Sequence, residues 1–173
     1  MELADGEIRL RPFREADVAA IAAACRDPEM GRFIPHLPWP YTESDAREYV
    51  KLTRRCDRGG DRLARAIVDA STDDLLGSVD VRLSETGSIG YWVVPWARGR
   101  GVATRALVLL SRWAIREGGV ERLELYTDVA NLASQRVAEK AGFQREGVLR
   151  SHLVFRGGRR NSVIFSLLPG DIA

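Results

Sequence analysis

The segment from residue 89 to residue 118 constrains the fold more than any other part of the sequence. An apolar run at 89–94 ends at Pro95, and Gly99 and Gly101 follow soon after. From Gly101 onward, apolar residues recur at the three- and four-residue spacing that one face of a helix requires. The segment therefore predicts a strand that passes through a glycine-rich turn directly into a long amphipathic helix, as in α/β domains.

The rest of the chain supplies further strands and helices around this unit, without repeats or a linker. We predict one mixed α/β domain over residues 1–173, with a mostly antiparallel central sheet of roughly six to seven strands and helices on both faces. Strands are expected at 6–12, 63–70, 75–83, 89–94, 121–127 and twice within 143–168, and helices at 16–26, 42–59, 101–118 and 132–141, with a proline-rich loop at 34–41.

Charge and composition exclude several classes of protein. Lys plus Arg number 26 against 24 for Asp plus Glu, a net charge of +2 that argues against an extended nucleic-acid surface. No apolar run approaches the roughly 18 residues of a membrane helix. Cys25 and Cys56 are too sparse for a disulfide framework or a zinc site, so we expect free thiols and no metal. These features predict a soluble, cytoplasmic protein.

The turn at 98–104 has the chemistry of an anion site. Backbone N–H groups at a helix N-terminus lack partners and carry positive potential. Small residues at 99, 101 and 103 let a bulky anion approach this backbone, and arginines at 98, 100 and 105 add charge. We therefore predict a cradle for a phosphate or pyrophosphate. Its predicted members are Arg98, Gly99, Arg100, Gly101, Ala103 and Thr104.

Three phosphate motifs compete at this turn, besides a plain turn with no ligand. A P-loop needs a Gly-Lys-Ser/Thr ending, which is absent, and a dinucleotide fingerprint needs a third glycine where Thr104 stands. The pattern Gln/Arg-x-x-Gly-x-Gly/Ala is matched by Arg98, Gly101 and Ala103. This is motif A of the GCN5-related N-acetyltransferases (GNAT), which the chain resembles.

A second block supports the resemblance. Residues 131–143 contain Asn-x-x-Ser and Glu-Lys-x-Gly-Phe, and Glu-Gly-Val-Leu-Arg follows at 146–150. These sequences, the Pro-Trp-Pro-Tyr loop at 38–41 and the Ser-Leu-Leu ending at 166–168 are similar to the ribosomal-protein N-terminal acetyltransferase (RimJ/RimL-type) branch. The resemblance extends from about residue 8 to residue 168.

The resemblance implies acetyl-CoA as co-substrate, with its pyrophosphate on the amides of 99–104. It also implies a bulge that separates the strand before the turn from the strand at 121–127, so that pantetheine pairs with the backbone of Val93 and Val94. Many family members donate a proton to the leaving thiolate from a tyrosine on the following helix. Residues 131–143 contain no tyrosine, so Ser134 becomes the candidate, and Asn131 either contacts pantetheine or only caps its helix.

The general base is not identified by the sequence. The position where the family often carries an acid is Ser88, and Asp80, Glu124 and His152 are weak candidates beside water alone. Branch members usually have Asp where this chain has Asn161. Rigid aromatic and polar residues of the proline-rich loop are weak candidates for the acceptor site, although they could equally close the core. These loop residues are His36, Trp39 and Tyr41.

The resemblance implies an enzyme that transfers acetyl from acetyl-CoA to a primary amine, either a protein N-terminus or a small amine, by direct attack in a ternary complex. The alternative is a non-catalytic or weakly catalytic CoA-binding module of the same fold. A homodimer is left open, because no residue pattern decides the oligomeric state.

Overall fold

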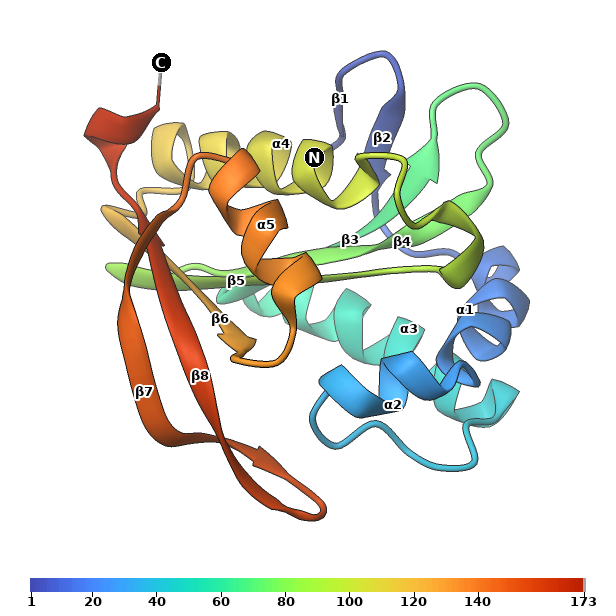
Figure 1. The fold of residues 1–173 in the computed structure, drawn as a ribbon. Helices are drawn as coiled ribbons and strands as arrows, with labels where there is room; N and C mark the ends of the chain where they lie inside the picture. Colours follow the sequence, from blue (N-terminus) through green and yellow to red (C-terminus); the bar gives the residue numbers. More distant parts are fainter. Residues whose placement is uncertain (173) are drawn as a thin grey trace.

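The computed structural model describes residues 1–172, which form a sheet of eight strands in the order β1-β2-β3-β4-β5-β6-β8-β7 (Figure 1). All neighbouring strands are antiparallel except β5 and β6, which are parallel. The predicted mixed, mostly antiparallel sheet is confirmed. It has one strand more than expected, because the two-residue β1 is too short to alternate recognisably. The strands are β1 (Leu3–Ala4), β2 (Ile8–Arg11), β3 (Arg62–Asp69), β4 (Leu75–Arg82), β5 (Thr86–Val93), β6 (Arg122–Asp128), β7 (Gln144–Phe155) and β8 (Gly158–Leu167).

The helices follow the predicted order with one addition. The first predicted helix is α1 (Val18–Cys25), preceded by one 3-10 turn, and a short α2 (Pro28–Phe33) follows in a segment for which no element was predicted. Pro28 begins α2 because the first turn of a helix needs no N–H there, and the Asp27 side chain accepts the Glu29 N–H as its cap. The remaining helices are α3 (Glu43–Gly59), α4 (Val102–Arg116) and α5 (Leu132–Lys140).

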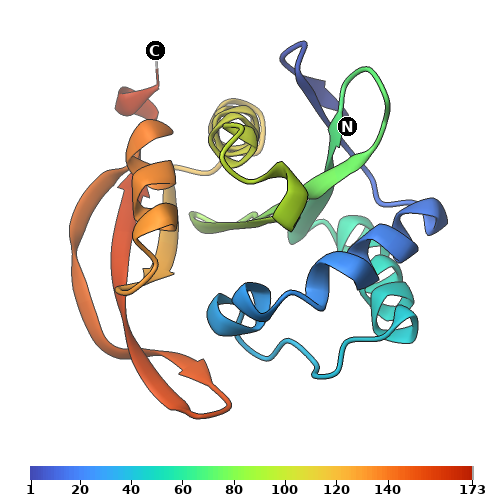
Figure 2. The same ribbon diagram turned by 45° about the vertical axis from the view of Figure 1, so that its right-hand side comes forward.

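Helices cover both faces of the sheet, as predicted (Figure 2). On one face, α4 and α5 bury a cluster that includes Leu107, Leu110 and Phe165. On the other, α1 and α3 bury a smaller cluster around Ile21 and Val50. Within residues 1–172, no helix is long and apolar enough to cross a bilayer.

The sheet is divided by a gap between β5 and β6. These strands pair only at residues 86–88 of β5 and 122–124 of β6 and then diverge. The pairing of β4 with β5 is continuous from Gly77–Val93 to Arg82–Ser88, so the expected bulge in β5 is absent. Each strand instead stays with its antiparallel neighbour, β5 with β4 and β6 with β8, and the twist between the two sets opens the gap.

Candidate functional site

The glycine turn leaves the start of α4 open. Gly101 is the N-cap of α4 with φ +77°, and Gly99 has φ +76°, conformations that favour glycine. A Cβ atom at either position would have no other atom within 4 Å. No side chain caps this helix, so the N–H groups at 102–104 have no partner within it. The turn therefore offers free amides and open space to an anion, as a pyrophosphate requires.

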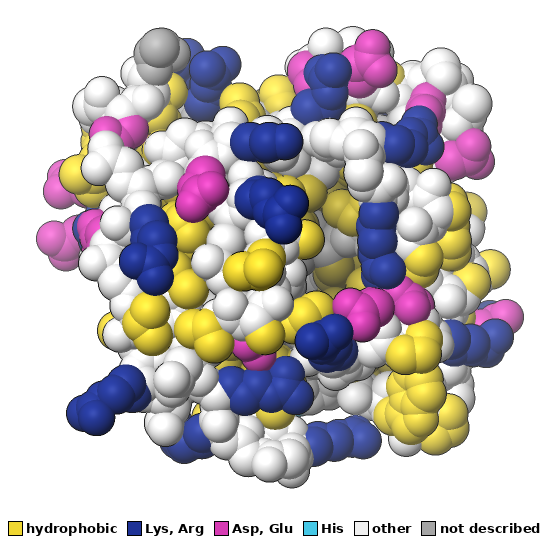
Figure 3. All heavy atoms as spheres, in the orientation of Figure 1, with side chains coloured by type: hydrophobic (Ala, Val, Ile, Leu, Met, Phe, Trp, Pro, Cys, Tyr) yellow, Lys and Arg dark blue, Asp and Glu magenta, His cyan; other side chains and the backbone are white. Residues whose placement is uncertain are grey.

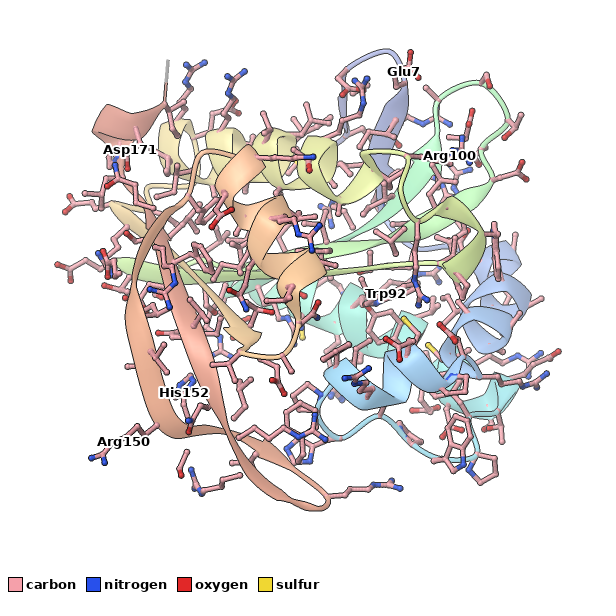
Figure 4. All side chains as sticks on the ribbon, in the orientation of Figure 1. Glu7, Trp92, Arg100, Arg150, His152 and Asp171 are labelled. Carbon is pink, nitrogen blue, oxygen red and sulfur yellow. The ribbon has the colours of Figure 1, made fainter. Side chains whose placement is uncertain are left out.

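The arginines around the turn are held by carboxylates. Arg98 donates to Asp27, the N-cap of α2, at 2.5 Å, and is 41% exposed. Arg105 donates to Asp5 at 3.0 Å, whereas Arg100 lies 3.9 Å from Asp69 (Figure 4). The link between Arg98 and Asp27 joins α2 to the turn, and nothing in the sequence indicated it.

Val93 and Val94 differ in whether their backbone N–H and C=O groups are free to bind a ligand. The N–H of Val94 donates to the Leu76 carbonyl at 2.9 Å, and the Val94 carbonyl accepts from Ala97 at 3.0 Å. Peptide groups alternate in direction along a strand, so those of Val93 and Tyr91 point away from β4, into the gap. Val93 can thus pair with an extended ligand. The expectation for Val94 is not supported, because its N–H is already used.

Ser134 and Asn131 lie at the start of α5, beside the gap. The Asn131 side chain caps the helix by accepting the Ser134 N–H at 3.0 Å. The Ser134 hydroxyl accepts a hydrogen bond from the Tyr91 hydroxyl of β5 at 3.0 Å. Burial raises the pKa of Tyr91 to about 12, so its hydroxyl stays protonated. The family motif places a tyrosine on the helix and so gives no indication of Tyr91, although the alternation of β5 directs residues 89, 91 and 93 to one face.

A recess is visible on the surface between α5 and the turn before α4 (Figure 3). Hydrophobic side chains form its floor, and Lys or Arg side chains stand on both of its sides. The elements that carry the free amides, the unpaired edge of β5 and the Ser134 hydroxyl lie side by side, because α4 packs against both β5 and α5.

The opposite face of the sheet contains a cavity of about 230 Å³. Asp80 of β4 lines it and accepts a hydrogen bond from Arg62 at 2.9 Å. Tyr126 of β6 forms another wall. Of the three weak candidates for the base, Asp80 alone is among the residues that line this cavity.

Tyr126 connects the other two base candidates. Its hydroxyl donates to Glu124, and this bond, aided by Arg122, lowers the pKa of Glu124. The His152 ring lies 4.6 Å from the Tyr126 ring, and its Nδ1 is 2.9 Å from the Ser162 hydroxyl (Figure 4). Glu124 is therefore held as a carboxylate in a network of its own. The sequence offered a signal for Tyr126, because residues 124, 126 and 128 alternate onto one face of β6.

The aromatic residues of the proline-rich loop do not gather at this cavity. Tyr41 is 5% exposed and packs in the core cluster of α1 and α3, where its hydroxyl contacts the Cys25 thiol. This burial favours the alternative for Tyr41, that it closes the core, over a place in the acceptor site. His36 and Trp39 are exposed on the loop between α2 and α3. Cys25 and Cys56 are free thiols, as expected.

Comparison with known proteins places this geometry in a family. The family described as "Acetyltransferase (GNAT) domain" matches residues 7–144. "Probable N-acetyltransferase YjcK" of Bacillus subtilis is 33% identical over 110 residues, which span 61% of each protein. The "Ribosomal-protein-serine acetyltransferase" of Escherichia coli is 29% identical over 66% of each chain. RimJ of Mycobacterium smegmatis, solved "in complex with CoA-disulfide", superposes with a TM-score of 0.89 at 21% identity, covering 99% of this chain and 89% of RimJ.

The family match covers the turn before α4, the strands that border the gap and the start of α5. The two blocks of sequence that predicted the family lie within or beside the matched residues. The chain therefore belongs to the GNAT family of acetyltransferases.

Proposed function

We propose that the protein transfers an acetyl group from acetyl-CoA to a primary amine. The observation that carries the proposal is the uncapped start of α4, which packs against β5 with its unpaired edge and against α5 with the Ser134 hydroxyl. The amides at 102–104 and Arg98 would hold the pyrophosphate, and Val93 would pair with pantetheine. The open space at Gly99 and Gly101 fits a group of this size.

The names of relatives support the choice of co-substrate and acceptor. RimJ of M. smegmatis was solved in complex with CoA-disulfide, and the E. coli relative is named for a ribosomal protein. The cavity of about 230 Å³ beside Asp80 is smaller than the roughly 300–1,000 Å³ of typical small-molecule pockets. Either acceptor presents a chain end that such a cavity admits, so we favour a protein N-terminus over a polyamine on the name of the E. coli relative.

Asp80 is our candidate for the general base. The acceptor amine must be neutral to attack the thioester carbonyl. In the reaction, a C–N bond forms, the C–S bond breaks with its electron pair on sulfur, and the nitrogen loses a proton. The Asp80 carboxylate lines the cavity through which an amine would approach the gap, and it would take this proton directly or through water.

Titration calorimetry with acetyl-CoA, beside NADH as control, tests the co-substrate. Micromolar binding of acetyl-CoA alone is expected, and equal binding of both would favour the dinucleotide interpretation. Thiol release is then measured with peptides that have a free N-terminus, with the same peptides acetylated at the N-terminus, and with polyamines. Release with the free peptides alone is expected, whereas acetyl-CoA binding without release for any amine would leave a CoA-binding module.

The Asp80→Asn variant tests the base, with Asp61→Asn at the exposed turn before β3 as the matched control. Turnover of Asp80→Asn should fall by about 10²-fold or more, as is typical for loss of a general base. The deficit should shrink at high pH, where the amine is neutral without help. A deficit that is the same at every pH would show that Asp80 has only a structural role.

A further inference from the structure

The hydroxyls of Tyr91 and Ser134 connect the two elements that border the gap. Tyr91 lies on β5 beyond the last residue paired with β6, and Ser134 lies in the first turn of α5. Tyr91 donates and Ser134 accepts, at 3.0 Å. A serine hydroxyl has one proton and two lone pairs. Because one lone pair is occupied by Tyr91, the Ser134 proton is directed away from that bond and is free to reach an acceptor.

We propose that Tyr91 is a positioning residue that orients and polarises the Ser134 hydroxyl toward the sulfur of the leaving thiolate. The proposal rests on the proposed function and adds the group that orients the Ser134 hydroxyl. Ser134 touches the sulfur, and Tyr91 acts only through Ser134. The C–S electron pair becomes the thiolate, which accepts a hydrogen bond from Ser134, so no proton has to cross Tyr91.

Two physical arguments support this role. Hydrogen bonds in a chain polarise one another, so a serine that accepts from a phenol donates more strongly. The Tyr91 hydroxyl, buried and protonated at neutral pH, cannot reverse the direction of the bond by ionising. A free serine lacks this constraint and can rotate to donate to its own helix.

The test measures the ionisation of the CoA thiol in the bound state, which does not depend on turnover. CoA is bound to the wild-type protein and to Tyr91→Phe, Ser134→Ala and the double variant, and thiolate absorbance is followed against pH. The pKa of the bound thiol should rise in Ser134→Ala, where the acid dissociation constant falls about tenfold, and in Tyr91→Phe, where it falls about threefold. The double variant should match Ser134→Ala, because Tyr91 has no separate path to sulfur.

Tyr49→Phe is the matched control. Tyr49 of α3 also pairs with a serine, Ser78, at 3.0 Å, but on the opposite face of the sheet. Its loss should cost similar stability and leave the pKa of the bound thiol unchanged. Ser134→Thr, which keeps a hydroxyl, should restore most of the effect lost in Ser134→Ala.

The outcomes separate this inference from the proposed function. If CoA does not bind, the proposed function fails. If CoA binds and the thiol pKa is the same in wild type and Tyr91→Phe, the role of Tyr91 is refuted while the function stands. Additive effects of the two substitutions would also refute it, because they would show that Tyr91 acts independently of Ser134.

Discussion

Replacing Gly101 tests the anion cradle, with a control just beyond the other end of the same helix. Gly101 precedes α4 with φ +77°, and Gly119 follows α4 with φ +71°. A Cβ atom would meet nothing within 4 Å at either position. Alanine at either site therefore carries the same left-handed strain of about 1–2 kcal/mol. For a chain of this length, each variant should lose roughly 2–8 °C in Tm.

Only the substitutions at Gly101 should affect the co-substrate. In Gly101→Ala, the methyl group occupies space above the free amides, and in Gly101→Glu a carboxylate enters it. Repulsion between unit charges 4 Å apart is about 1 kcal/mol in bulk water and about 4 kcal/mol near a protein surface. At 1.4 kcal/mol per tenfold, Gly101→Glu should raise the Kd for acetyl-CoA by roughly 5- to 700-fold.

Titration calorimetry at constant ionic strength provides the assay, with Tm measured in parallel. Gly119→Ala should bind acetyl-CoA as the wild-type protein does. The Gly101→Glu effect should weaken in high salt, because the repulsion is partly screened. Unchanged acetyl-CoA affinity in a folded Gly101→Glu protein would refute the cradle, and an equal loss in Gly119→Ala would show that strain alone weakens binding.

Three further substitutions test other contacts. Arg98→Met should raise the Kd for acetyl-CoA about tenfold by removing a charge-assisted contact. Asp27→Asn, which keeps the α2 cap, should lower this Kd, because Arg98 is then released from Asp27. Weaker calorimetric binding in both variants would contradict the idea that Asp27 and acetyl-CoA compete for Arg98. Asp73 has its pKa lowered from 3.8 to about 2 by hydrogen bonds from arginines, first of all Arg11. Because the folded-state pKa is the lower one, its contribution is present above about pH 4 and is lost as pH falls toward 2. Asp73→Asn should therefore destabilise by about 1 kcal/mol at pH 7, discounted for a side chain that is 35% exposed, and a urea-unfolding difference that persists at pH 2 would exclude a charge effect. An added Cβ at Gly77 would overlap a neighbouring backbone carbonyl, so Gly77→Ala should cost about 1–3 kcal/mol in urea unfolding, and no loss relative to the unobstructed Gly147→Ala would contradict it.

Local sequence patterns predicted the fold well. The glycines at 99 and 101 take the left-handed conformations that the turn requires, and Asn131 caps α5 as its position indicated. Both depend on interactions within a few residues. Strand order could not be predicted in this way, because it depends on distant residues. The last strand, β8, pairs with both β6 and β7 and so lies between them. The sequence of β6 contains no signal for its partner.

The parts of the site that escaped prediction join residues far apart in the chain. Tyr91 and Ser134 are 43 positions apart, and Arg98 and Asp27 are 71 apart. Neither pair follows from periodicity, because each depends on how the helices sit on the sheet. The burial of Tyr41 has the same origin. A tyrosine in a proline-rich loop looks exposed until packing against α1 and α3 buries it.

The short pairing between β5 and β6 determines where the sheet opens locally. Three residue pairs connect the strands β1–β5 with the strands β6–β8 through the sheet. Backbone groups beside such a seam exchange their protons through local opening, at a free energy below that of global unfolding. Amides that face the gap from residues 89–93 should therefore exchange with solvent well before those inside the β3–β4 pair. A ligand that pairs with this edge would tie the two sets of strands into one cooperative unit.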